Sequence, residues 1–250
     1  MRQQIGDEPD PAVGDEVVAV VAPHASILPG WFPPIGRNRL PSVDDMKISI
    51  LGTGNMAAAV AQAWIGAGHT VTIAGRSADK AAELAGRLGA YAAAPSDAAA
   101  GADAVVVAVS WDGVPDMIEL AGGSRGALRG VPVLDCTNPV DFGTGAHRLA
   151  TGSAAETIAA QATGASVVKA LHLYAGQMWL TSQERPRVVA MCGDDEAALD
   201  VVGRLVTDLG GTPVAVGGLD HARQLEEAAG FVVSLYGKGV DPSTAIPSVG

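Results

Sequence analysis

Short apolar runs alternate with longer amphipathic stretches from residue 46 onward. The first run, Lys47-Ile48-Ser49-Ile50-Leu51, has the length and branched side chains of a buried strand, and helical spacing follows it. The predicted strands span 47–51, 70–74, 103–109, 131–134, 166–170, 187–192 and 213–216, and the predicted helices span 56–67, 77–88, 153–163, 196–209 and 220–236. Strands that alternate with helices are typical of a doubly wound parallel sheet with right-handed crossovers. We therefore predict an α/β fold.

Residues 1–45 differ from the rest of the chain. They contain seven of its 15 prolines, and a run such as Pro29-Gly30-Trp31-Phe32-Pro33-Pro34 cannot continue a helix or a central strand. We predict a proline-rich, loosely ordered leader, and a true start at Met46 is one form of this interpretation. The alternative is an arm that docks through Trp31 and Phe32 onto the body or onto a second subunit.

Composition narrows the function classes. A net charge of −11 argues against a nucleic-acid partner, because neutralising phosphates requires a face rich in lysine and arginine. No apolar stretch reaches the ~20 residues of a membrane span, and the first ten residues lack the order of a signal peptide. Cys136 and Cys192 have no metal or redox spacing and are predicted to be buried, reduced thiols. These features predict a cytoplasmic protein with no membrane partner.

A glycine-rich turn separates the first predicted strand from the first predicted helix. Its sequence is Gly52-Thr53-Gly54-Asn55-Met56-Ala57, a GxGxxA variant. The first glycine permits the tight turn, the second lets the backbone approach a pyrophosphate, and the small Ala57 keeps the helix close to the sheet. Such a motif indicates dinucleotide binding when a strand precedes it and a helix and a second strand follow it, as they do here. The sequence therefore predicts a dinucleotide site on a Rossmann-type sheet, with Gly52, Thr53, Gly54, Asn55 and Met56 contacting the cofactor.

The end of the second strand indicates which dinucleotide binds. NAD-binding proteins place Asp or Glu there to accept a hydrogen bond from the ribose 2′-hydroxyl. This chain instead has Arg76, followed by Ser77 and, one helical turn later, Lys80. An arginine fork, a hydroxyl and a nearby ammonium suit a 2′-phosphate, so we predict NADP(H). The alternative for Arg76 is an ordinary solvated surface residue.

Two further segments follow strand ends, where the ligands of open α/β sheets bind. Ser110 and Trp111 follow the 103–109 strand and are predicted to lie beside the nicotinamide ribose. Asn138, in Thr137-Asn138-Pro139, follows the 131–134 strand and is predicted to bond the ribose or carboxamide. The alternatives are a helix N-cap at Ser110 or Asp112 and an ordinary Asn-Pro turn.

Together these segments resemble the NADPH-dependent reductases of the deazaflavin coenzyme F420. The likeness covers residues 46–240 and is carried by Ile50-Leu51-Gly52-Thr53-Gly54-Asn55-Met56, the Arg76 region, Ser153-Ala154-Ala155-Glu156, Val168-Lys169-Ala170-Leu171-His172 and Cys192-Gly193-Asp194-Asp195. The resemblance implies an NADP-binding domain over 46–165, a C-terminal α/β extension over 166–240 that completes the substrate cleft, and a tail over 241–250.

The resemblance also implies the chemistry, which is direct hydride transfer between nicotinamide and deazaflavin. The two cofactors carry that reaction, and the protein aligns their rings. No metal-ligand cluster and no nucleophile–base order stands out, so we predict no metal site. Pro139, His172 and Tyr174 are predicted to line the side of the second substrate, with His172 as the candidate catalytic residue. A satisfied structural histidine is the alternative.

The chain departs from the family pattern at two positions. The family's serine-arginine-arginine cluster is reduced to Gly75-Arg76-Ser77, and its basic loop after the Asn-Pro turn is replaced by Asp141-Phe142-Gly143. An acid there would repel an anionic deazaflavin tail. Three hypotheses follow: an NADPH:F420 oxidoreductase, an NADPH-dependent reductase of a small imine or carbonyl compound, and a non-catalytic NADP-binding redox sensor.

The last predicted helix carries an apolar stripe. Its members at helical spacing are Leu225, Ala228, Ala229, Val232 and Tyr236, and Phe231 and Leu235 widen it. We predict that this stripe forms a homodimer interface. The alternative is that it only covers the sheet.

Overall fold

The computed structural model describes residues 45–181 and 187–247. The predicted leader lies outside these residues except for Asp45. The strands are β1 (Lys47–Leu51), β2 (Thr70–Ala74), β3 (Tyr91–Ala93), β4 (Ala104–Val107), β5 (Pro132–Asp135), β6 (Ser166–Lys169), β7 (Arg187–Gly193) and β8 (Gly211–Ala215). The α-helices are α1 (Asn55–Ala67), α2 (Ala78–Leu88), α3 (Val114–Leu120), α4 (Ala154–Gln161), α5 (Glu196–Asp208) and α6 (Ala222–Tyr236). Short 3-10 helices include η2 (Trp111–Gly113), η4 (Gly176–Leu180) and η6 (Pro242–Ala245).

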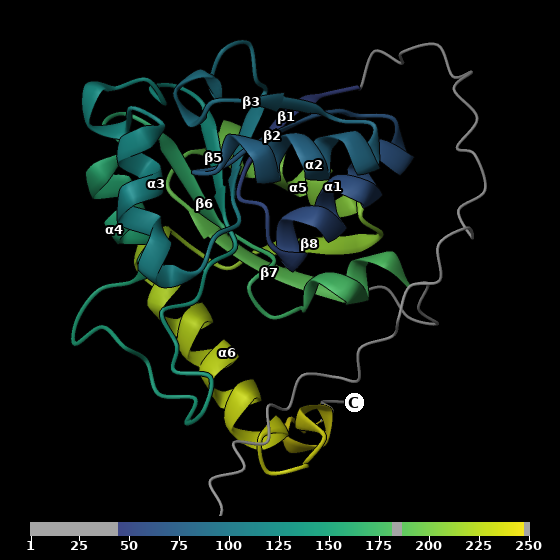
Figure 1. Ribbon diagram of the computed structural model, residues 1–250. Helices are drawn as coiled ribbons and strands as arrows, with labels where there is room; N and C mark the ends of the chain where they lie inside the picture. The colour runs from purple at the N-terminus through teal and green to yellow at the C-terminus, as the bar shows by residue number, and fades with distance from the viewer. Residues whose placement is uncertain (1–44, 182–186, 248–250) are drawn as a thin grey trace, which may run out of the picture. The chain divides into compact units, whose positions relative to one another are not determined.

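The described strands form one sheet in the order β3-β2-β1-β4-β5-β6-β7-β8, with β1 to β6 parallel (Figure 1). The chain runs outward from β1 through β2 to β3 and then returns to β4 on the other side of β1. Strand order therefore reverses between β1 and β4, which is where doubly wound sheets bind ligands. The predicted Rossmann-type fold is confirmed.

One part of the sheet departs from the parallel arrangement that we predicted. Strand β7 runs antiparallel to β6, with Val168 opposite Gly193, and β8 is parallel to β7. A parallel neighbour requires a crossover that carries the chain back along the sheet, usually as an α-helix. Between β6 and β7 the described residues form only the short η4, so β7 begins at the edge of the sheet where β6 ends.

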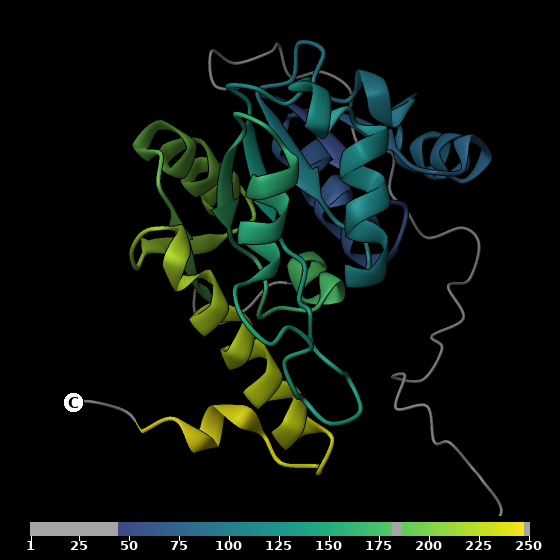
Figure 2. The same ribbon diagram turned by 90° about the vertical axis from the view of Figure 1, so that its left-hand side faces the viewer.

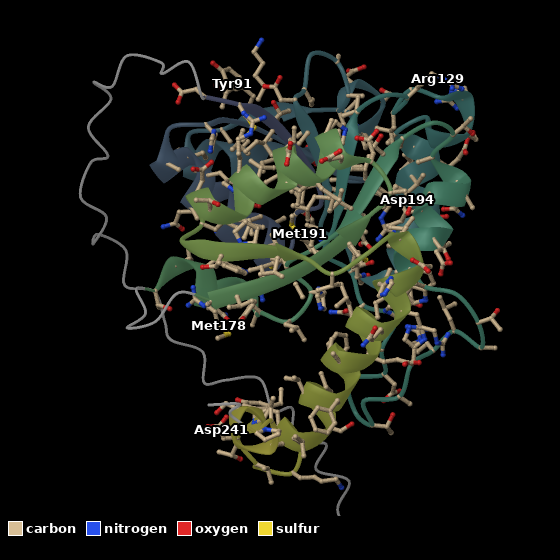
Figure 3. All side chains as sticks on the ribbon, turned by 180° about the vertical axis from the view of Figure 1, so that it is seen from behind. Tyr91, Arg129, Met178, Met191, Asp194 and Asp241 are labelled. Carbon is tan, nitrogen blue, oxygen red and sulfur yellow. The ribbon has the colours of Figure 1, made fainter. Side chains whose placement is uncertain are left out.

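Helices cover both faces of the sheet because alternate strand residues point to opposite sides. Ile48 and Ile50 of β1 pack with α1, α2 and α5, whereas Val105 and Val107 of β4 pack with α3, α4 and α6. Figure 1 shows α1 and α2 on one side of the strands and α3 and α4 on the other. Met191 of β7 belongs to the first layer, and Figure 3 shows it beneath α5.

The first half of helix α6 packs on the sheet, and its second half projects away from it. Leu225 and Ala229 in its first half are buried, whereas Phe231 and Tyr236 in its second half are 48% and 63% exposed. Figure 2 shows the second half projecting beside the loop at residues 140–149. Gly145 of that loop lies directly against Gly230 of the helix, so neither position has room for a side chain. The stripe predicted from the sequence thus covers the body at one end and faces solvent at the other.

Candidate active site

The glycine turn after β1 has the backbone geometry that a bound pyrophosphate requires. Gly52 has φ of +145°, and a Cβ atom there would lie 2.2 Å from the carbonyl oxygen of Ala108. Gly54 is the N-cap of α1, and a Cβ atom there would meet nothing within 4 Å. Gly52 therefore closes the turn against β4, whereas Gly54 leaves open space over the helix N-terminus. The first N–H groups of α1 have no partner within the helix and can bind an anion there. The turn thus fits a dinucleotide.

The end of β2 lies against this turn. The Gly52 amide donates to the carbonyl of Ala74, and a Cβ atom on Gly75 would come within 2.9 Å of the Thr53 methyl group. The two strand ends are therefore tightly packed. The residue after Gly75 is Arg76, whose side chain is 59% exposed and thus free to reach a ligand.

The three residues predicted to bind a 2′-phosphate lie together at the start of α2. The Ser77 hydroxyl accepts a bond from the Lys80 amide and caps the helix, which leaves the hydroxyl proton available to a ligand. The side chain of Lys80 is exposed. Arg76 Nη1 lies 3.9 Å from a carboxylate oxygen of Asp116 in α3. This long and exposed contact holds the guanidinium only weakly.

The segment after β4 meets Arg76 at the sheet edge. A Cβ atom on Gly113 would lie 3.7 Å from both the Ser110 hydroxyl and the Arg76 guanidinium, so these two side chains converge on one point. Ser110 is exposed at the N-cap of η2, and its side chain makes no capping bond. Trp111 is half-buried against the α3 layer. Ser110 therefore remains available to a ligand, whereas much of Trp111 contributes to packing.

The turn after β5 and the turn after β6 are joined by one hydrogen bond. The Asn138 side-chain amide donates to the carbonyl of His172 at 2.8 Å. Asn138 Oδ1 and the Thr137 hydroxyl are buried and have no partner among the described residues. Pro139 is buried, and its carbonyl accepts from the Arg148 amide. Buried polar atoms without partners are rare in folded proteins, so these two oxygens mark a place where a ligand or water is expected.

His172 is the third group of this kind. It is only 6% exposed, and neither ring nitrogen has a partner among the described residues. Burial, helped by the Lys169 ammonium, lowers the pKa of His172 to about 3, so the imidazole is neutral at physiological pH. Leu171 beside it adopts φ of 59°, a left-handed conformation that non-glycine residues accept mainly where structure or function demands it.

The chain then crosses from β6 back to the glycine turn. A Cβ atom on Gly176 would lie 2.9 Å from the Asn55 carbonyl, so η4 sits directly on the first turn of α1. Trp179 of η4 is buried in the core and meets Tyr174 edge to face at 5.3 Å. The Tyr174 hydroxyl already donates to the carbonyl of Val188. Tyr174, predicted to line the substrate side, thus has its polar group engaged in holding η4 against β7.

Sequence reasoning missed a buried ionic cluster directly behind the Asn138 turn. Lys169 of β6 lies 2.9 Å from Asp135 of β5 and 2.8 Å from Glu226 of α6, and all three side chains are fully buried. Glu226 also lies 3.0 Å from His147 of the 140–149 loop. The isolated signal was Lys169 itself, a charge inside a strand that is otherwise apolar.

The described residues include no group of three or more His, Cys, Asp and Glu side chains arranged to hold a metal ion. Within the same part of the chain, every helix is too short or too polar to span a bilayer. Cys136 and Cys192 are both free thiols, and burial raises the pKa of each to about 12. Neither thiol is therefore a reactive nucleophile.

Comparison with known proteins identifies the family. Residues 47–139 match the family model described as NADP oxidoreductase coenzyme F420-dependent. The F420-dependent NADP reductase of Methanothermobacter thermautotrophicus is 32% identical over 209 residues, which cover 76% of this chain and 89% of that protein. The chain belongs to this family. It is an enzyme of the NADP-dependent oxidoreductase class, which sets aside the sensor hypothesis.

Two further relatives bear on this membership. A crystal structure from Arthrobacter, provisionally assigned as an F420-dependent NADP-reductase, has a TM-score of 0.68 and 28% identity, and the match covers 78% of this chain and 96% of that one. Metalloreductase STEAP3 of Rattus norvegicus is 29% identical over 181 residues. That match covers 72% of this chain but only 36% of the rat protein, so the chain spans little more than a third of it.

Proposed function

We propose that this F420-dependent NADP reductase family member transfers a hydride between NADP(H) and coenzyme F420. Bound together, the two rings supply the whole reaction: a hydride leaves nicotinamide C4 and enters the deazaflavin, and one proton from water balances the charge. The protein's task is then to hold two rings in contact and to exclude water between them. The names of the relatives support F420 as the second substrate.

The observation that carries the proposal is the state of His172. The one predicted acid–base residue at the carboxyl edge of the sheet is a neutral imidazole with a pKa of about 3, and its ring nitrogens have no partner in the part of the chain that the structure describes. A neutral imidazole donates or accepts a hydrogen bond but delivers no proton at neutral pH. It therefore suits a reaction that needs orientation rather than a general acid.

The cofactor is held, in this proposal, by groups from four strand ends. The pyrophosphate binds at the N-terminus of α1 over Gly54, and the 2′-phosphate binds Arg76, Ser77 and Lys80. The nicotinamide end lies towards Ser110 and Asn138, and the second ring lies towards His172 and Pro139. Open space over Gly54 and the unpartnered oxygen of Asn138 support these positions.

The acidic loop after Pro139 favours the second candidate, a small imine or carbonyl substrate. Asp141 is exposed, and its pKa is lowered by hydrogen bonds from Thr144 and Gly143, so it is ionised at neutral pH. Those bonds turn the carboxylate into its own loop, and Arg148 lies close enough to offset part of its charge. The repulsion of an anionic tail is thereby reduced, so F420 remains the first candidate.

The deciding experiment follows deuterium from nicotinamide C4. Purified protein is mixed with C4-deuterated NADPH and oxidised F420, with no metal or flavin added, and reduced F420 is examined for the label. Transfer of the label into F420, at a rate that NADH does not match, is the expected result. Failure to reduce F420 at saturating NADPH, together with NADPH oxidation by a cyclic imine or a ketone, would favour the second candidate.

We also propose a homodimer in a cytoplasmic setting. The second half of α6 and the adjacent loop expose Phe142, Phe231 and Tyr236, which a partner subunit would cover. The two free thiols fit a reducing compartment.

A further inference from the structure

Lys169 is a charged side chain with no exposure, and its ammonium group is fully bonded. Its three N–H donors face Asp135 Oδ2, Glu226 Oε1 and the carbonyl oxygen of Thr137. Three donors meeting three acceptors leave none unsatisfied. The two carboxylates outweigh burial and raise the pKa of Lys169, so the ammonium stays charged in the interior. Because desolvation offsets much of the attraction in a buried ion pair, net stability alone is a weak reason for such an arrangement.

The geometry that this cluster specifies is the turn after β5. Asp135 accepts a bond from the Thr137 amide through Oδ1 and binds Lys169 through Oδ2. Lys169 in turn binds the Thr137 carbonyl. Both polar groups of the Thr137 backbone are thus held by one ion pair, and the next residue, Asn138, donates to the carbonyl of His172. The ion pair therefore fixes the turn that carries the unpartnered oxygens of the site.

Glu226 of α6 is the second carboxylate that holds the ammonium. Its carboxylate accepts from the Ala154 amide at 3.0 Å, at the N-terminus of α4, and lies 3.0 Å from His147. The N-terminus of a helix favours a negative charge. Glu226 is therefore held in place by α4 and the 140–149 loop, which leaves Lys169 little freedom to move away from Asp135.

We propose that Lys169 is a positioning residue of the redox site, whose ammonium, fixed by Asp135 and Glu226, holds the Thr137–Asn138 turn in the shape that receives the nicotinamide end of the cofactor. This inference rests on the proposed position of the nicotinamide. Lys169 touches no ligand itself because it is fully buried beneath the turn. Among the described residues, Arg76, where the adenosine end is proposed to bind, makes its ion pair with Asp116 and none with this cluster, so the effect of Lys169 should be local.

The test uses that locality. The variant Lys169→Met keeps roughly the length of the side chain and removes its charge. The double variant Asp135→Asn with Lys169→Met also neutralises Asp135, while Glu226 keeps its contacts with the Ala154 amide and His147. Binding is measured for NADP⁺ and for 2′,5′-ADP, a fragment that lacks nicotinamide. We expect the double variant to bind NADP⁺ at least tenfold more weakly and to bind 2′,5′-ADP within twofold of the native protein.

Two controls separate positioning from stability. Asp208→Asn removes the carboxylate that faces His69, a partly buried contact between the end of α5 and the start of β2, and should leave both affinities unchanged. Asn138→Ala should reproduce the selective loss of NADP⁺ affinity. Combining Asn138→Ala with the double variant should weaken NADP⁺ binding little further, because both act on the same turn. Equal losses for both ligands, or no loss in a folded double variant, would overturn the proposal. Because no F420 is used, failure of the proposed reaction would leave this result interpretable.

Discussion

Arg76 offers the sharpest test of cofactor choice. The change Arg76→Ala removes the guanidinium at the end of β2 but leaves the glycine turn intact. A hydrogen bond to a charged group contributes about 1.5–3 kcal/mol, and breaking the exposed 3.9 Å contact with Asp116 offsets only a small part of it. We therefore expect NADPH to lose about 2 kcal/mol, which corresponds to roughly thirtyfold in Kd. NADH has no 2′-phosphate, so its Kd should not change.

Titration calorimetry with both cofactors measures this difference directly. Asp116→Asn is the matched control, because it frees Arg76 without removing it and should leave NADPH affinity equal or slightly higher. The NADPH preference should also shrink as salt rises, since the contact is exposed and screened. Equal losses for NADPH and NADH in Arg76→Ala would show that Arg76 acts on the fold of the turn rather than on the phosphate.

The remaining predictions concern the turn, the histidine and the dimer. Gly52→Ala should lower Tm by more than ~5 °C, because Gly52 has φ of +145° and a Cβ atom there would clash with backbone. Gly54→Ala should keep the native Tm and weaken NADPH binding, and similar Tm values for the two variants would contradict this. His172→Ala should lower kcat about tenfold, and native kcat/KM should show no inflection near pH 6.5; a loss of ~10³ would indicate a general acid. With a folded pKa of about 3, His172 should reduce stability as pH falls from about 6.5 towards 3, because only the unfolded chain then takes up the proton. Light scattering should show a dimer that Phe231→Ser with Tyr236→Ser converts to monomer; a monomeric native protein would reject the interface.

The sequence was sufficient for most of the fold because the strands and helices of this sheet are locally encoded. Every predicted element is present among the described residues, with bounds that shift by at most two residues. Among the described strands and α-helices, two were missed. Strand β3 contains only Tyr91, Ala92 and Ala93, and α3 has seven residues with Pro115 in its first turn, so neither shows a period long enough to recognise.

The reversed direction of β7 could not be predicted from periodicity, because the spacing of apolar residues is the same in both directions. The relevant signal was the absence of a helical pattern over 170–186, which removes the crossover that a parallel strand needs. Conversely, the positions of the glycine turn and of Arg76 could be predicted, because both are defined by the strand and helix next to them in the sequence. The structure places both at the carboxyl edge of the sheet, after β1 and after β2.

The ionic cluster behind the Asn138 turn could not be assembled from local patterns, because its members come from distant parts of the chain. Lys169 and Asp135 are 34 residues apart, and Glu226 comes from the last α-helix. A lysine in a strand buried on both faces nevertheless demands an acidic neighbour. In the observed register Asp135 is directly opposite Lys169, so the pair follows as soon as β5 and β6 are known to be adjacent. The missing information was therefore which strands are neighbours in the sheet. A lysine inside a central strand is a reason to search the ends of neighbouring strands for the acidic residue that pairs with it.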